Sequence, residues 1–208
     1  MAENQLPKGW INSTLSEVTL KITDGTHKTP NYQDEGVRFI SIKNIKPFKP
    51  INWEVYEKYI SEEEHIELSK RAKVEIGDIV FPRIGTLGFA KIVDWEEECS
   101  IFVGLGLIKL FPNTINSKFI EYYLNSPLIY ELSHQKATGT GRLTLSLKES
   151  KSLPVSLPPL AEQQRIVAKL DAVLAEIKNA NEAIIKSKAN YLALKSAILS
   201  KELQSEAA

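Results

Sequence analysis

The C-terminal quarter of the chain constrains the fold most strongly. From Pro159 to about Glu202 it contains no glycine and no internal proline, and its apolar residues recur every seven residues. Two columns spaced alternately four and three apart lie on one seam of a single helix. At 1.5 Å per residue the helix would be roughly 65 Å long, more than a small domain needs for its own core. We therefore predict a long helix over 160–203 whose seam pairs with another helix. The seam consists of Ile166, Leu170, Val173, Ile177, Ala180, Ile184, Ser187, Tyr191, Leu194 and Ile198.

Residues 1–153 have a different pattern, in which short apolar runs alternate with turn residues. This pattern predicts an α+β domain with a curved or barrel-like sheet and a few helices. Helices are expected at 61–70, capped by Ser61, and at 117–134, capped by Ser117 and broken near Pro127. Segments 23–26 and 28–31 are expected to be loops. Strands are expected at 36–42, 78–81, 89–93 and 100–110.

A proline-rich segment separates the two regions. Three prolines at 154, 158 and 159 favour an extended conformation and end any preceding element. We predict a hinge over 154–159, with Pro159 in the first turn of the long helix and Glu162 near its positive end. Residues 204–208 are expected to be a disordered tail.

Composition excludes several classes of protein. The 208 residues suffice for one domain and an appendage, and no apolar run reaches the length of a membrane span. The polar N-terminus lacks a signal peptide, and the single cysteine, Cys99, fits a reducing compartment, so a cytoplasmic location is expected. The 26 basic and 26 acidic residues balance, which argues mildly against a protein that coats nucleic acid non-specifically.

No catalytic or metal-binding pattern is present in the sequence. His27, His65 and His134 are far apart, and none forms a metal-ligand pair with Cys99. There is no phosphate-binding P-loop and no nucleophile elbow. We therefore expect neither a metal nor an enzyme that acts alone.

The placement of charge is more informative than its total. Residues 36–50 hold four basic residues and no acidic one, and residues 136–151 hold four basic residues and only Glu149. Acidic residues gather instead at 62–64 and 96–98. Separated charges of this kind favour a surface whose positive side follows phosphates, although a mixed solvated surface fits the composition equally well.

Several motifs together resemble the DNA-specificity subunits of type I restriction-modification systems. The junction at 157–167, LPPLAEQQRIV, resembles the family's "PLPPLxEQxxIV" motif. In the family's order, LPKGW at 6–10, TDGTH at 23–27, FISIKNI at 39–45, GDIV at 77–80 and ATGT at 137–140 also resemble its motifs. The resemblance covers nearly the whole chain.

This resemblance implies a target recognition domain over 1–153 that binds one half of a split double-stranded DNA sequence, with the long helix as a spacer. Family members usually carry two such domains and two such helices, so this chain resembles a half-length form, natural or truncated. The resemblance also implies a methyltransferase subunit that binds S-adenosylmethionine and possibly a restriction subunit that uses ATP, with no cofactor bound by this chain. An identical chain could supply the second helix in an antiparallel homodimer, which would read a two-part palindrome.

Candidate DNA contacts follow from loop placement and side-chain chemistry. The alternative is a coiled-coil assembly protein whose globular head binds another protein, and the lack of a basic excess favours it slightly. An isolated enzyme is a third and weaker interpretation. The candidates are Asp24, Gly25, Thr26, His27, Lys28, Lys43, Asn44, Arg83, Thr86, Arg142 and Thr144.

Overall fold

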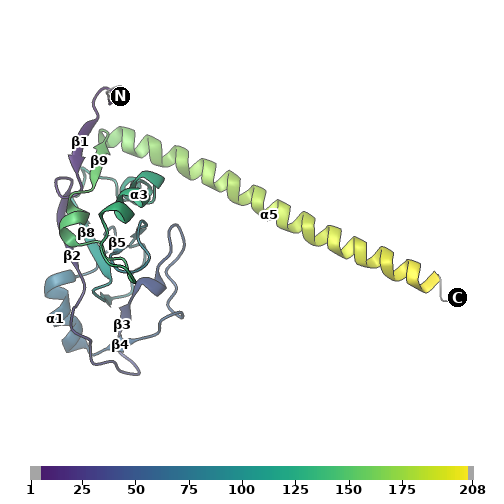
Figure 1. The fold of residues 1–208 in the computed structure, drawn as a ribbon, viewed down its shortest axis with the longest axis horizontal. Helices are drawn as coiled ribbons and strands as arrows, with labels where there is room; N and C mark the ends of the chain where they lie inside the picture. Colours follow the sequence, from purple (N-terminus) through teal and green to yellow (C-terminus); the bar gives the residue numbers. More distant parts are fainter. Residues whose placement is uncertain (1–5, 206–208) are drawn as a thin grey trace. The chain divides into compact units, whose positions relative to one another are not determined.

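The computed structural model describes residues 6–205, and the side chains of residues 6–199 (Figure 1). The chain divides into two compact units, one ending at Gln164 and the other beginning at Arg165. We call the described part of the first unit, residues 6–164, the head. The second unit is helical throughout its described length.

The head combines short strands with short helices, which confirms the α+β class. Its strands form three small sheets and do not close into a barrel: β2-β8-β5-β6, β4-β3-β7 and the pair β1-β9. The strands are β1 Ile11–Thr14, β2 Thr19–Asp24, β3 Val37–Ile40, β4 Tyr59–Ile60, β5 Ile79–Pro82, β6 Lys91–Ile92, β7 Cys99–Ile101, β8 Leu105–Leu110 and β9 Pro154–Leu157.

Strand β8 lies at the centre of the largest sheet, with β2 and β5 antiparallel on its two sides. Its first four residues are buried, as expected for a strand covered on both faces. Gly106 is required there, because a Cβ at this position would overlap the ring of Phe81 on β5. The central sheet therefore packs closely where β2, β5 and β8 meet.

Two strand predictions need correction. The run predicted as one strand over 100–110 forms β7 and β8, which lie in different sheets on either side of a turn at 102–104. Strand β2 extends through Thr23 and Asp24, which the sequence placed in a loop. Pairing with β8 decides this second case, because Asp24 lies opposite Gly106 in the ladder.

The helices of the head begin at polar caps. Helix α1, Glu62–Ala72, begins after Ser61, whose hydroxyl accepts from the Glu64 N–H at 3.2 Å, as predicted. The predicted helix over 117–134 is divided into α2, Ser117–Leu124, and α3, Pro127–Lys136. Its cap is Asn116, not Ser117, because the Asn116 side chain accepts from the Phe119 N–H. A further short helix, α4, covers Leu147–Lys151.

Much of the segment predicted as a hinge is a strand. Pro154–Leu157 forms β9 and pairs antiparallel with β1, so that Ile11 lies opposite Leu157. Pro154 is tolerated because it is the first residue of the strand. The Leu15 N–H also donates to the Leu153 carbonyl at 2.8 Å. The N-terminal strand is thus held against the segment that leads into the long helix.

The start of the long helix α5, Leu160–Ser205, is fixed by Pro159 and Gln163. The Pro159 carbonyl accepts from the backbone N–H groups of Glu162 and Gln163. Gln163 is 1% exposed, and its side chain accepts from the Asn116 N–H at 2.8 Å and donates to the Pro158 carbonyl at 2.9 Å. These bonds join the first turn of α5 to the segment before α2.

Helix α5 contains 46 residues, which corresponds to about 69 Å. The helix runs two residues past the predicted end at 203, and the remainder of the predicted tail, residues 206–208, lies outside the described residues. No helix within residues 6–205 is both long enough and apolar enough to cross a bilayer.

Candidate nucleic-acid interface

Several strands end at the same edge of the head. Strands β2, β3, β5 and β7 all finish there, and β8 begins there. Three backbone bonds join the segments that follow: Val103 N–H to Thr26 O at 3.0 Å, Phe102 N–H to Ile40 O at 3.1 Å, and Arg83 N–H to Gly104 O at 2.8 Å. The sheets thereby bring together segments that are up to about 80 residues apart in the chain.

The loop before α4 joins the same edge. The Leu145 N–H donates to the Arg83 carbonyl and the Gly85 N–H donates to the Leu143 carbonyl, both at 2.8 Å. Thr138 and Thr144 exchange backbone hydrogen bonds, which close the loop between them. We define the loop cluster as residues 25–28, 41–44, 83–88, 102–104 and 137–144.

The loop cluster contains four basic residues and no acidic residue. Lys28, Lys43 and Arg142 are exposed, whereas Arg83 is buried. The exposed residues also include His27 and Thr86. Exposed cations among hydroxyls, glycines and backbone N–H groups are suited to phosphates and base edges.

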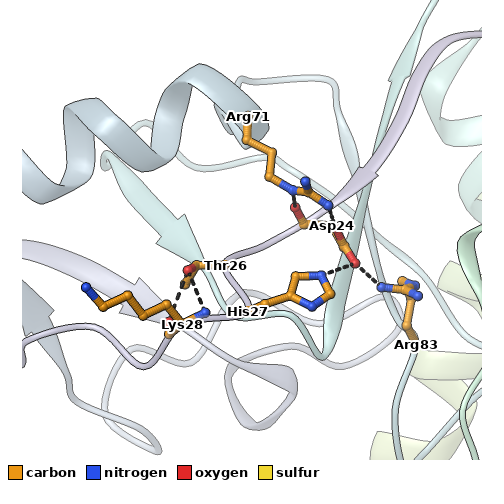
Figure 2. Close-up of polar contacts among 6 residues, drawn as sticks. All are labelled: Asp24, Thr26, His27, Lys28, Arg71 and Arg83. Atoms are coloured by element: carbon orange, nitrogen blue, oxygen red, sulfur yellow. Dashed lines mark hydrogen bonds and ion pairs between the residues drawn. The ribbon is translucent and has the colours of Figure 1, made fainter.

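A buried carboxylate organises the first loop (Figure 2). The Asp24 side chain is 2% exposed and lies between Arg71, from the last turn of α1, and Arg83, just after β5. Each arginine donates to one of its two carboxylate oxygens. His27 Nε2 lies 3.0 Å from Asp24 Oδ2, and Arg71 Nε donates to the Asp24 carbonyl at 3.2 Å. This network joins α1, β2 and β5.

The network keeps Asp24 ionised. Burial by itself raises the pKa of Asp24, but the hydrogen bond from Arg71, the charge of Arg83 and the contact with His27 together outweigh burial. The pKa of Asp24 therefore lies below its usual value of 3.8. At neutral pH the carboxylate is charged and orients both guanidinium groups.

Three of the candidate DNA contacts, Asp24, Arg83 and Asn44, are buried in the structure. Asp24 and Arg83 are buried and pair with each other. Asn44 is 1% exposed, accepts from the Ser41 N–H at 2.9 Å and donates to the Asn52 carbonyl at 2.9 Å. These side chains support the edge and are not presented to a ligand.

The other candidates in the loop cluster differ in how exposed they are to solvent. Gly25 is buried, and Thr26 and Thr144 are partly buried. The Thr26 hydroxyl bonds to the backbone of Lys28, which fixes the turn between them. His27, Lys28, Lys43, Thr86 and Arg142 are exposed, and their contact with DNA stays a prediction.

Gly25 has a steric role. A Cβ at this position would overlap the Ile101 carbonyl oxygen. We expect Gly25→Ala to destabilise the head by about 1–3 kcal/mol, because the ends of β2 and β7 must separate. Thermal unfolding should show a melting temperature lower by roughly 5 °C. Gly141→Ala is the matched control, because a Cβ there meets nothing within 4 Å; equal melting temperatures for the two variants would contradict the assignment.

Sequence reasoning missed Arg71. Arg71 lies near the end of a predicted helix and belongs to none of the family motifs. Nothing in the sequence therefore relates it to Asp24, which lies 47 residues earlier. Its side chain is 54% exposed and lines an open hollow of about 560 Å³ beside residues 25–27. A structure was needed to place it next to the candidate residues.

No metal centre was found among the described residues, since no group of three or more His, Cys, Asp or Glu side chains could hold an ion. Cys99 is buried, and burial raises the pKa of its thiol to about 12. A protonated, enclosed thiol of this kind is unreactive.

The second unit presents the apolar seam to solvent. Ile177, Ile184, Tyr191 and Leu194 are 50–65% exposed, and they lie on one side of the helix. Large side chains in such a continuous row are unusual on the surface of a monomer and mark an interaction site. Within residues 6–199 these seam side chains are exposed, and their pairing with another helix stays a prediction.

A head that gathers basic and hydroxyl side chains at one edge, followed by a long helix with an exposed seam, is typical of a DNA-recognition module with a helical spacer. The family model described as the type I restriction modification DNA specificity domain matches residues 7–205. The chain belongs to this family.

Relatives agree with this assignment. The chain is 28% identical over 139 residues to the type I restriction enzyme EcoBI specificity subunit of Escherichia coli, which covers 66% of this chain and 29% of that protein. It is 26% identical over 191 residues to the EcoKI specificity subunit of Escherichia coli strain K12, which covers 85% of this chain and 39% of that protein. The chain therefore spans well under half of these relatives.

Solved structures share the fold. A chain from a structure of a type I restriction-modification system matches with a TM-score of 0.73 and 22% identity, over 96% of this chain and 47% of that chain. The HsdS subunit from Thermoanaerobacter tengcongensis matches with a TM-score of 0.61 and 23% identity, over 88% of this chain and 41% of that chain.

Proposed function

We propose that this chain is a non-catalytic, cytoplasmic specificity subunit whose head reads one half of a bipartite double-stranded DNA sequence. The observation that carries the proposal is the loop cluster, which gathers the exposed cations Lys28, Lys43 and Arg142 from two strand ends and one loop, with no acidic residue in the cluster. Irregular loops on a packed scaffold are suited to recognition, because their side chains can vary without disturbing the core.

The seam of α5 supports a symmetric dimer. An identical helix can cover it through two-fold symmetry. Antiparallel pairing would place one head at each end of the paired helices, so the dimer would read a two-part palindrome. The small or polar seam residues Ala180 and Ser187 and the flanking Asn181 and Lys188 favour one register over others.

A second apolar stripe supports docking of a methyltransferase subunit. Leu174, Ile185, Leu192 and Leu199 are 41–69% exposed, and their spacing of eleven and seven residues keeps them within an arc of about 40° beside the seam. A helix paired along the seam would leave Ile185, Leu192 and Leu199 largely uncovered, because they lie further round the helix than the two seam columns. In the proposed complex the methyltransferase occupies the second row and supplies S-adenosylmethionine chemistry, and an ATP-using restriction subunit joins the assembly.

Methylome sequencing tests the proposal. A host that expresses this chain with its methyltransferase should carry methylation at one two-part palindrome, and the methyltransferase alone should not produce it. DNA affinity should fall steeply with salt, because bound phosphates release counterions. Salt-insensitive binding to a protein, with no new methylation, would instead support the assembly-protein alternative.

Arg142 and Lys43 should differ in their effect on recognition. We expect Arg142→Ala to lower discrimination at one base pair by about 1–3 kcal/mol, because an exposed arginine in a recognition loop can pair with a guanine edge. Lys43→Ala should weaken binding to all sequences alike, since lysine contacts phosphates as a point charge. Binding titrations against single-base variants of the target measure both. Unchanged affinity and selectivity in Arg142→Ala would remove that residue from the interface.

A further inference from the structure

The network around Asp24, formed with Arg71, Arg83 and His27, has a net positive charge, because two guanidinium groups share one carboxylate. One carboxylate accepts from two guanidinium groups, and His27 contacts the same carboxylate. Within the described residues, Asp24 is the acidic partner recorded for both Arg71 and Arg83. Arg83 Nε is also buried without a hydrogen-bond partner among these residues. The network is therefore short of negative charge and of one acceptor.

The excess charge borders the hollow of about 560 Å³. Arg71, His27 and Thr26 from the network and its loop line it, together with Ser100 and Glu67. Glu67 is the acidic group on this wall, and its carboxylate pairs with Lys70. Two donors of Arg71 point to Asp24, and a guanidinium has five, so three remain for a ligand.

We propose that this hollow binds one phosphodiester of the DNA backbone, with Arg71 as the principal donor. Asp24 is a positioning residue, because it fixes the plane of the Arg71 guanidinium without contacting DNA. The inference rests on the proposed function, since it adds a backbone contact beside the loop cluster. Such a contact fixes the register of the head on the duplex and carries no sequence information itself.

Salt titration of DNA binding tests the site. Arg71→Gln keeps a side chain that can bond to Asp24 but removes the charge. On a duplex carrying the sequence identified by methylome sequencing, we expect affinity to fall about tenfold. The slope of log affinity against log salt should decrease by about one for each bound protomer. Discrimination between sequences should not change.

Lys73→Gln is the matched control, because it removes the same charge two residues away, where Lys73 pairs with Glu75. A scan with methylphosphonates, which neutralise one phosphate at a time, adds a second readout. One position should weaken the wild-type complex and have no effect on Arg71→Gln. If Arg71→Gln does not fold, Arg71→Lys tests the site instead. Because lysine keeps the positive charge, this variant should show the wild-type salt slope and the same sensitive phosphate.

The possible failures are distinguishable. If the wild-type complex shows no sequence-specific binding, the proposed function fails. If it binds specifically but Arg71→Gln and Lys73→Gln share one salt slope and one methylphosphonate pattern, only the Arg71 site is wrong. Stabilisation of the wild type by inorganic phosphate at matched ionic strength, lost in Arg71→Gln without any change in DNA binding, would assign the hollow to free phosphate instead.

Discussion

Exchange of Ile177 and Ile184 for aspartate should convert the proposed homodimer into monomers at micromolar concentration. Both residues are at least half exposed on the isolated helix and lie in one column of the seam. In a two-fold pair the double variant replaces four buried side chains, each contributing about 1.5–3 kcal/mol. The dissociation constant should rise by more than about 10⁴-fold. Sedimentation velocity measures the change directly.

The double variant Ala172→Asp and Asn179→Asp is the control. These positions have the same seven-residue spacing and lie on the side of α5 away from the seam. This variant should remain a dimer. A wild-type protein that is already monomeric at micromolar concentration would overturn the symmetric model, whatever the variants do.

Asp24→Asn should destabilise the head by about 3 kcal/mol at neutral pH. The substitution removes the carboxylate between two arginines and leaves the buried Arg83 without a counter-charge. Removal of one member of a buried ion pair is far more costly than loss of a surface pair. Urea unfolding followed by tryptophan fluorescence measures the difference.

The same variant should change the response of the protein to acid. The pKa of Asp24 is lowered in the folded state, so its contribution is complete above about pH 4 and is lost as pH falls through the folded pKa. The stability difference between wild type and Asp24→Asn should therefore shrink below about pH 4. Asp34→Asn, at an exposed position, should follow the wild type throughout. A constant difference down to pH 2 would rule out this assignment for Asp24.

Local signals predicted the helices well and the short strands less well. Ser61 caps α1 and Pro127 begins α3, because capping and proline geometry act within a few residues. Strands β1 and β9 were missed, because each is stabilised by pairing with the other, and the paired residues lie 140 or more positions apart in the chain. The turn at 102–104 was missed for a similar reason, since β7 and β8 belong to different sheets.

By itself the sequence determined the long helix, its seam, the α+β class and the family resemblance. Heptad spacing and local motifs depend only on residues that are close together in the chain. Only the tertiary structure decided which candidate residues are available to a ligand. Asp24 and Arg83 have the chemistry of DNA contacts, yet they are buried against each other. Arg71 carries no motif, yet the end of α1 places it beside them. Exposure and pairing depend on contacts between distant segments, and those contacts exist only after β2, β5 and α1 have packed together.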